Sequence, residues 1–153
     1  MRRAASVPTK SLRCATFKFR ALLAALWAGQ LLTVALLAAP NAFATLARPE
    51  AGAYVARLFL IDARLSLGLA LALLVMEQRL QRDAHPERLR ICAPLMLPLL
   101  ALLLTVAGYE ALQPLLVQAK AVGSSNFALL HGLSMAAFSA KAATVLVLAW
   151  RVR

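Results

Sequence analysis

The sequence has few charged residues, and this shortage decides its broad class. Only 15% of the 153 residues are charged, whereas 62% are hydrophobic. A soluble domain averages about 25% charged and about 45–50% apolar residues, so this chain has too little polar surface to cover a water-soluble particle. The composition excludes an ordinary globular enzyme and a disordered chain. It predicts one small domain embedded in a lipid bilayer.

The sequence also lacks the motifs of common catalytic and ligand sites. It contains no glycine-rich phosphate loop, no Walker sequence, no zinc-spaced set of cysteine and histidine, and no nucleophile elbow. We therefore expect no catalytic residue, no enzymatic activity and no bound cofactor, and the sequence specifies no metal. The two cysteines, Cys14 and Cys92, match no metal or redox spacing. They are expected to be reduced apolar fillers at the cytoplasmic face.

The basic residues gather beside long apolar runs, and the formal net charge is +11. Six of them stand in the first twenty positions with no acid among them: Arg2, Arg3, Lys10, Arg13, Lys18 and Arg20. Clusters that adjoin apolar runs are typical of the cytoplasmic flanks of membrane helices, whereas a nucleic-acid surface needs no such neighbours. We expect the basic N-terminal residues to contact anionic lipid headgroups and expect no nucleic-acid partner.

Four apolar runs predict an all-α integral membrane bundle of four helices, since about twenty apolar residues suffice to span a bilayer. Lys and Arg are frequent in the N-terminal tail, the second connection and the C-terminal end, so both termini are predicted to be cytoplasmic. The expected bounds are a basic cytoplasmic tail at 1–18 and a transmembrane domain at 19–150, with helices at about 19–43, 54–76, 91–109 and 127–150.

The N-terminus imitates a secretory signal peptide. Its uncharged stretch from Ala21 to Ala39 covers nineteen residues, which is longer than the roughly 7–15 residues of a signal-peptide apolar region. We therefore predict an uncleaved first helix. The alternatives are cleavage near Thr45 and a mitochondrial transit peptide.

Polar residues interrupt the fourth run, where His131, Ser134 and Lys141 are expected on one helix face. His131 is either a proton carrier or ligand in the bundle interior, or a neutral histidine that bonds to another helix, and we favour the second interpretation. Lys141 either snorkels to the cytoplasmic face or pairs inside the bundle, with Gln30 of the first run as a candidate partner.

A stripe of small residues on the same run predicts helix packing. Gly132, Ala136 and Ala140 stand four residues apart, and small residues at this spacing let two membrane helices approach closely. We expect this contact inside the bundle. Association with a second copy of the chain, or with another subunit of a membrane complex, is a separate expectation that does not depend on this stripe.

Three charged residues interrupt the second run. Arg57 and Arg64 share a stripe and are expected to snorkel to the outer headgroups. Asp62 is shorter and is expected to point inward, toward His131. Together with Glu110 at the end of the third run, these two residues would form an outer-side cluster. Such a cluster either binds a cation or relays protons, or it is a structural polar knot, which we rank first.

Several short motifs carry a family resemblance. They are LWAG at 26–29, AP at 39–40, AG at 51–52, LF at 58–59 and LHGLS at 130–134. Over about residues 22–150 the sequence resembles the transmembrane-protein-205-like family, the bacterial membrane group described as domain of unknown function 4149. The resemblance implies four transmembrane helices in a bacterial inner membrane and adds weight to His131 and Ser134 as a matched pair. It implies no reaction.

Together these features predict a multi-pass, non-enzymatic membrane protein with an open molecular role. We favour a small module that binds protons or cations or lets them permeate. One alternative is a redox component that binds haem or quinone through His131, since the other histidine, His85, lies in a predicted loop. Another alternative is a structural or assembly subunit of a membrane complex.

Overall fold

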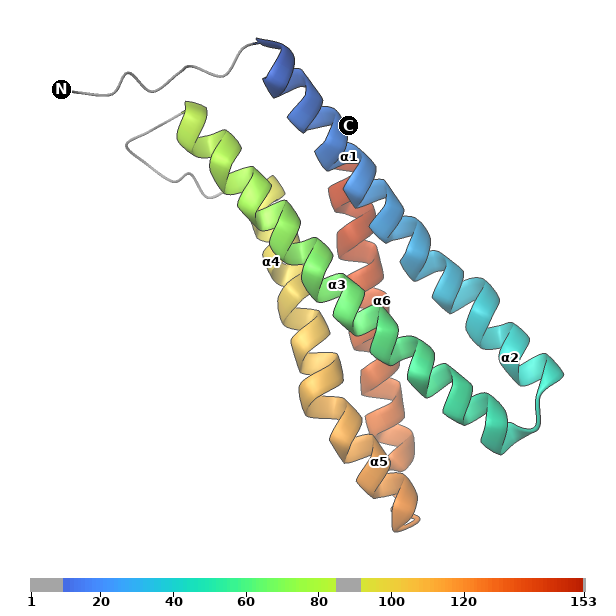
Figure 1. Cartoon of the computed structure of the whole chain (residues 1–153). Helices are drawn as coiled ribbons and strands as arrows, with labels where there is room; N and C mark the ends of the chain where they lie inside the picture. The colour runs from blue at the N-terminus through green and yellow to red at the C-terminus, as the bar shows by residue number, and fades with distance from the viewer. Residues whose placement is uncertain (1–9, 85–91, 153) are drawn as a thin grey trace.

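The computed structural model describes residues 10–84 and 92–152, and all regular structure within these residues is helical. Figure 1 shows that the helices line up as four long rods. In chain order they are α1 (Lys10–Thr33), the π-helical segment η1 (Val34–Ala38), α2 (Ala39–Thr45), α3 (Arg48–Ala84), α4 (Ala93–Val106), the π-helical segment η2 (Ala107–Leu112), α5 (Gln113–Ala121) and α6 (Phe127–Arg151).

Some of the residues discussed above lie outside this description. Arg2, Arg3, His85 and the expected start of the third helix at residue 91 are outside the described residues, as are the side chains of Lys10 and Arg13. The described part of the predicted N-terminal tail, from Lys10 onward, is helical and continuous with the first rod. The first helix therefore begins earlier than residue 19.

Four segments of the described chain are long and apolar enough to cross a membrane: Cys14–Thr45, Arg48–Asp83, Ala93–Ala121 and Phe127–Arg151. Each exceeds the roughly twenty residues that a bilayer requires. The predicted all-helical architecture with four apolar helices is confirmed, and it indicates a multi-pass membrane protein. The third segment differs most from its expected bounds, because it continues to Ala121 and not only to residue 109.

Two π-helical segments carry the first and third rods past a proline. The segment η1 ends two residues before Pro40, and η2 ends two residues before Pro114. A proline in a helix donates no backbone hydrogen bond, and its ring clashes with the carbonyl group four residues earlier. A wider π turn changes the hydrogen-bond register locally and accommodates that loss. For this reason Pro40 does not end the first rod.

The four rods pack in a ring. The helix α1 contacts α3 and α6, and α4 contacts the same two helices, so α3 and α6 lie diagonally opposite each other (Figure 1). We call the end where α1 begins and α6 ends the terminal end, and the end formed by α2 and α5 the open end. Toward the open end, the first rod and α3 diverge from the third rod and α6.

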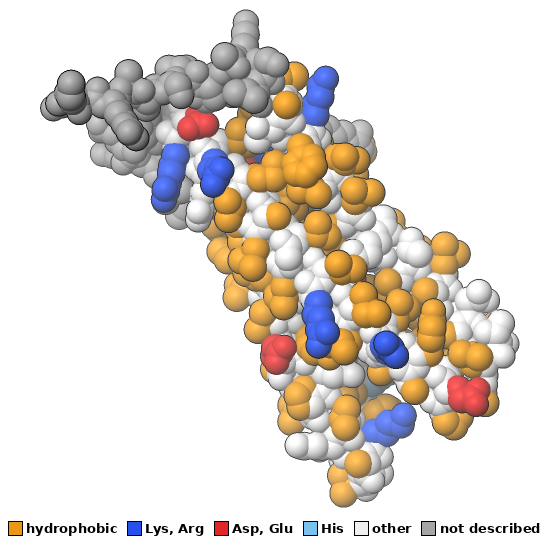
Figure 2. Space-filling model, viewed as in Figure 1, with side chains coloured by type: hydrophobic (Ala, Val, Ile, Leu, Met, Phe, Trp, Pro, Cys, Tyr) orange, Lys and Arg blue, Asp and Glu red, His pale blue; other side chains and the backbone are white. Residues whose placement is uncertain are grey.

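The apolar core lies toward the terminal end and is built from small and large side chains of all four rods. Its largest fully buried members include Trp27, Leu31, Leu73, Val145 and Leu148. The outer surface is also largely apolar, with many exposed leucine and valine side chains, and Figure 2 shows hydrophobic side chains spread along the visible face of the rods. Apolar side chains both inside and outside are expected of a bundle whose solvent is lipid.

Candidate functional site

A carboxylate and an ammonium group from diagonally opposite helices meet inside the bundle. The Nζ atom of Lys141 on α6 donates a hydrogen bond of 2.6 Å to Oδ2 of Asp62 on α3. The side chains are only 5% and 2% exposed, respectively. Either charge alone would be costly in this environment, because no water reaches it to replace the missing partner. The ion pair avoids this cost, and it joins α3 to α6, two helices that make little backbone contact with each other.

Other polar groups complete this network. Gln30 on α1 donates from Nε2 to Oδ1 of Asp62 over 2.9 Å, so both carboxylate oxygens have a partner. Trp27 donates from Nε1 to Oγ of Ser66 over 3.1 Å, and Lys141 Nζ lies 3.5 Å from the same hydroxyl oxygen. We call these five residues the central network. It ties α1, α3 and α6 together.

The local helix geometry explains why these side chains converge. Asp62 and Ser66 are four residues apart on α3, and Trp27 and Gln30 are three residues apart on α1, so each pair shares a helix face. Within the spans Cys14–Thr45, Arg48–Asp83 and Phe127–Arg151, the polar members lie close to the midpoint. The central network therefore occupies the middle of the bundle, farthest from both ends.

Aromatic rings cover the ion pair toward the open end. Phe59 precedes Asp62 by three residues and Phe138 precedes Lys141 by three, and their rings meet edge to face with centroids 5.2 Å apart. The ammonium group of Lys141 lies 4.9 Å from the Phe138 ring centroid, within the range of a cation–π contact. On the other side, Trp27 is fully buried. The charges are thus enclosed between aromatic side chains in both directions.

A second ion pair lies at the terminal end. Arg20 on α1 donates from Nη1 to Oε2 of Glu77 on α3. Nearby, Gln81 Nε2 lies 2.9 Å from the Cys92 sulfur. Arg20 was expected to contact lipid headgroups, but its side chain is only 11% exposed and pairs with Glu77. Cys92 was expected to be an apolar filler, yet its neighbours are polar.

Residues 22–125 match the family described as a domain of unknown function, DUF4149. The chain belongs to this family. No curated protein and no solved structure matches the chain. The matched stretch of this DUF4149 protein contains Gln30, Asp62 and Ser66, whereas Lys141 lies beyond it on α6.

The expected cluster of Asp62, Glu110 and His131 does not form in this DUF4149 protein. Asp62 points inward as expected, but toward Lys141. His131 is exposed, and its ring stacks on that of Phe127 with centroids 5.9 Å apart. Glu110 is also exposed and lines a separate cavity. In the described ranges 10–84 and 92–152, no three His, Cys, Asp or Glu side chains come together as a metal site.

The helical period explains why His131 and Lys141 separate. Ten residues divide them, and at about 3.6 residues per turn this places them roughly 80° apart around α6 and about 15 Å apart along it. The expected stripe relied on a seven-residue repeat, from which a straight helix drifts. Ser134, between them, is half-buried.

The small-residue stripe faces away from the bundle. Gly132, Ala136 and Ala140 are all exposed, and a Cβ atom added at Gly132 would meet nothing within 4 Å. The buried face of α6 instead contains Lys141, Thr144, Val145 and Leu148. The helix packing that we expected through the small residues is therefore absent from the described part of this single chain.

The contacts of Ser66, Trp27 and Glu77 were not predicted from the sequence. The pairing of Asp62 with Lys141 was not predicted either, although the sequence contains a signal for it. Two opposite charges near the middle of different spans are each costly in hydrocarbon, and pairing removes much of that cost. Lys141 turned out to be buried inside the bundle, and Gln30 joins it indirectly, through Asp62.

Proposed function

We propose that this protein is a non-enzymatic membrane module that binds and relays protons through Asp62 and Lys141. The observation that carries the proposal is the 2.6 Å ion pair, enclosed in the middle of a bundle of membrane-length helices. Ionisable groups at this depth are rare, and they mark proton or ion pathways in many membrane proteins. An aspartate and a lysine both exchange protons readily, which a static hydrogen-bonded pair of amides would not do.

The contacts favour a proton over a metal cation. Oδ1 of Asp62 accepts from Gln30 and Oδ2 accepts from Lys141, so both oxygens are engaged. The ammonium group of Lys141 would also repel a second cation at the same carboxylate. A proton adds to an oxygen without a coordination shell and fits a site of this size.

The relay conserves charge and protons. Asp62 takes a proton from one side of the membrane as its contact with Lys141 breaks, and Lys141 releases its own proton to the other side. Both side chains are then neutral. Transfer of the proton from the Asp62 carboxyl group to the Lys141 amine restores the ion pair, so one proton has entered and one has left. The rings of Phe59 and Phe138 must move for protons to reach the pair from the open end.

Proton flux in reconstituted vesicles tests this mechanism. Purified protein is placed in liposomes that contain a pH-sensitive dye, and a potassium gradient with valinomycin sets the membrane potential. We expect the wild type to change the internal pH faster than protein-free vesicles. The charge-balanced variant D62N/K141Q should abolish that excess flux while the protein still inserts.

The matched control is Arg57→Gln, which removes an exposed charge from α3 outside the central network. Its flux should equal that of the wild type. Wild-type flux no greater than that of empty vesicles would refute the proposal. So would a folded D62N/K141Q protein that conducts like the wild type, because the pair would then be only a structural contact.

We further propose a location for the protein and an orientation for its two ends in the membrane. The basic residues around the terminal end, among them Lys18, Arg79, Arg82 and Arg151, support a cytoplasmic position for that end of a bacterial inner-membrane protein. The LHGLS element at 130–134 supports kinship with transmembrane-protein-205-like proteins. Reporter fusions after Arg48 and Lys120 should report a periplasmic location, and fusions after Arg82 a cytoplasmic one. A cytoplasmic signal at Lys120 would overturn the orientation.

An assembly role is the second candidate, because one observation favours it specifically. The stripe of Gly132, Ala136 and Ala140 lies on the exposed face of α6, where another helix can approach closely. In this case the central network only holds the subunit together. Native mass spectrometry of the wild type in mild detergent should then give a complex that Gly132→Leu disrupts, and vesicles should show no excess flux.

A further inference from the structure

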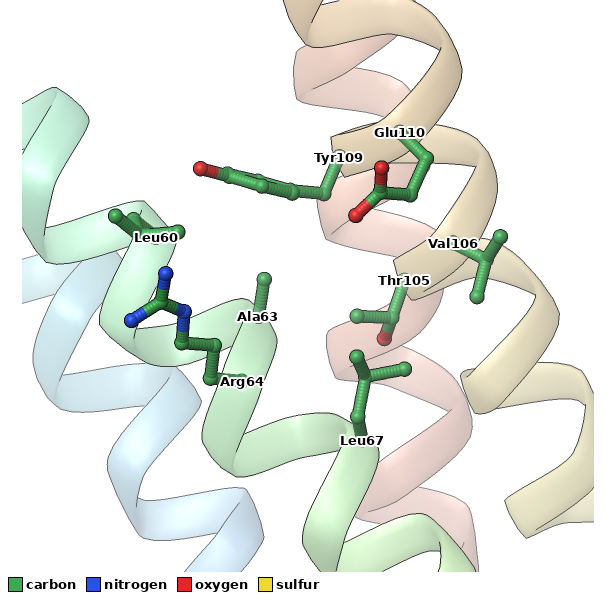
Figure 3. A pocket seen from close by; sticks show the side chains of 8 residues that line it. All are labelled: Leu60, Ala63, Arg64, Leu67, Thr105, Val106, Tyr109 and Glu110. Carbon is green, nitrogen blue, oxygen red and sulfur yellow. The ribbon is translucent and has the colours of Figure 1, made fainter.

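A cavity of about 240 Å³ opens between α3 and the third rod, on the side of the bundle. It is lined by Leu60, Ala63 and Leu67 of α3 and by Thr105 and Val106 of α4. Figure 3 shows three longer polar side chains that also line it: Arg64 from α3, and Tyr109 and Glu110 from η2.

The two charged side chains of the cavity, Arg64 and Glu110, have no partner among the residues that the structure describes. No ion pair or hydrogen bond of the Arg64 or Glu110 side chain is found within residues 10–84 and 92–152. In Figure 3 the guanidinium group of Arg64 rises along α3 toward the side reached by the Tyr109 ring, while the Glu110 carboxylate extends from the opposite wall. A cation and an anion thus face one cavity from two sides without meeting.

The π-helical segment η2 explains this geometry. Tyr109 and Glu110 are consecutive in sequence and lie in its wider turn. In a wider turn, consecutive side chains project at different angles from those of an α-helix. Both side chains border the same cavity, whereas Asp62, two residues before Arg64, turns to the bundle interior.

Exposed apolar side chains adjoin the residues that line the cavity. Val106 lines it and is 43% exposed. Ile61 and Leu65, each next in sequence to a lining residue of α3, are 48% and 49% exposed. In a bilayer these side chains contact acyl chains. A molecule with its polar group in the cavity would therefore leave an apolar tail against this exposed apolar surface.

We propose that this cavity binds the headgroup of a zwitterionic phospholipid with a primary ammonium group, as in phosphatidylethanolamine. Arg64 and the Tyr109 hydroxyl bind the phosphate, and the Glu110 carboxylate binds the ammonium group. A volume of about 240 Å³ is below the range of roughly 300–1,000 Å³ for pockets that enclose whole drug-sized ligands. It suits a headgroup whose acyl chains stay in the bilayer.

The charges distinguish this lipid from other amphiphiles. A purely anionic headgroup would satisfy Arg64 but leave Glu110 facing a like charge. A choline headgroup would satisfy the charge of Glu110 but donates no N–H hydrogen bond to it. Only a group with an anion and a hydrogen-bonding cation satisfies both walls of the cavity.

Lipid retention measured by native mass spectrometry tests the proposal. The purified protein is mixed with phosphatidylethanolamine, phosphatidylcholine and phosphatidylglycerol of identical acyl chains, in equal amounts. We expect the wild type to retain the ethanolamine lipid preferentially. Arg64→Gln should weaken its retention about tenfold, the effect of one charge-assisted hydrogen bond. Glu110→Gln should remove the preference for ethanolamine over choline and spare retention itself.

Arg57→Gln is the matched control, since it removes an exposed arginine of the same helix that does not line the cavity. Free phosphoethanolamine, which has no acyl chains, should not raise the thermal stability of the protein. Equal retention by the Arg64 and Arg57 variants would overturn the proposal. A preference for phosphatidylglycerol that Glu110→Gln leaves unchanged would also overturn it, because the cavity would then select only for negative charge.

Discussion

Asp62 and Arg64 stand two residues apart on α3, yet only the charge of Asp62 is compensated by another side chain of the described protein. Asp62 is 2% exposed, and both of its carboxylate oxygens accept hydrogen bonds. Arg64 is exposed on the side of the bundle, in a cavity where no described side chain pairs with it. Side chains of the protein thus compensate the charge of Asp62 in the centre of the bundle, whereas the charge of Arg64 on its side is open to lipid, water or another molecule.

The depth of each group inside the bundle accounts for this difference. Side chains from three rods enclose the central network, and the rings of Phe59 and Phe138 close it toward the open end. With no water and no lipid in reach, only protein groups can compensate a charge there. The cavity lined by Arg64 and Glu110, which we call the lateral cavity, opens at the outer surface, so an external molecule can supply a partner for Arg64.

The largest effect is expected where the central network is broken on one side only. Asp62→Leu leaves the Lys141 ammonium group buried without its counter-ion, and breaking a buried ion pair in this way costs about 3–5 kcal/mol. We expect the free energy of unfolding in mixed detergent micelles to fall by this amount. The double variant D62L/K141M removes both charges and should recover most of it. If both variants are equally unstable, the ion pair is not the reason for the loss.

A smaller loss is expected at the terminal end. Glu77→Leu removes the partner of Arg20, whose side chain is 11% exposed. Arg20 lies near the start of its span, so its long side chain can turn toward water or headgroups once released. We expect a loss of about 1–3 kcal/mol, the cost of one unsatisfied polar group. The same unfolding assay measures it, and a loss as large as that of Asp62→Leu would show that the ends and the centre are not different.

The lateral cavity should respond least in a lipid-free assay. Arg64→Gln removes a charge with no partner in the described protein, so the free energy of unfolding should change by no more than about 0.5 kcal/mol. Added phosphatidylethanolamine should then stabilise the wild type but not the variant, because binding to the folded state alone raises its stability. Destabilisation of Arg64→Gln without lipid would mean that Arg64 has a partner within the protein.

The sequence was sufficient for the four rods but not for the partners inside them. Length and hydropathy are local properties, so the four apolar helices were predictable, and so was the inward direction of Asp62. The order of the rods around the ring depends on contacts between distant parts of the sequence. Asp62 meets Lys141 only because α3 and α6 face each other diagonally across the ring. The π turns before Pro40 and Pro114 were also not predictable, because proline alone indicates a helix end as well as a kink.

His131 and Gly132 are neighbouring residues on the exposed face of α6. The sequence pattern predicts that Gly132→Leu is more harmful than His131→Leu, because a bulky residue would separate two packed helices. The structure reverses the first half of this expectation, since a Cβ atom at Gly132 meets no neighbour within 4 Å. Leucine also has a higher helix propensity than glycine, so Gly132→Leu should leave stability unchanged or raise it by up to about 1 kcal/mol. His131→Leu loses the stacked contact with Phe127 and should cost about 0.5–1 kcal/mol. Thermal unfolding of both variants in detergent decides between the two orders, and a Gly132→Leu protein that unfolds first would show that this face of α6 packs against another chain.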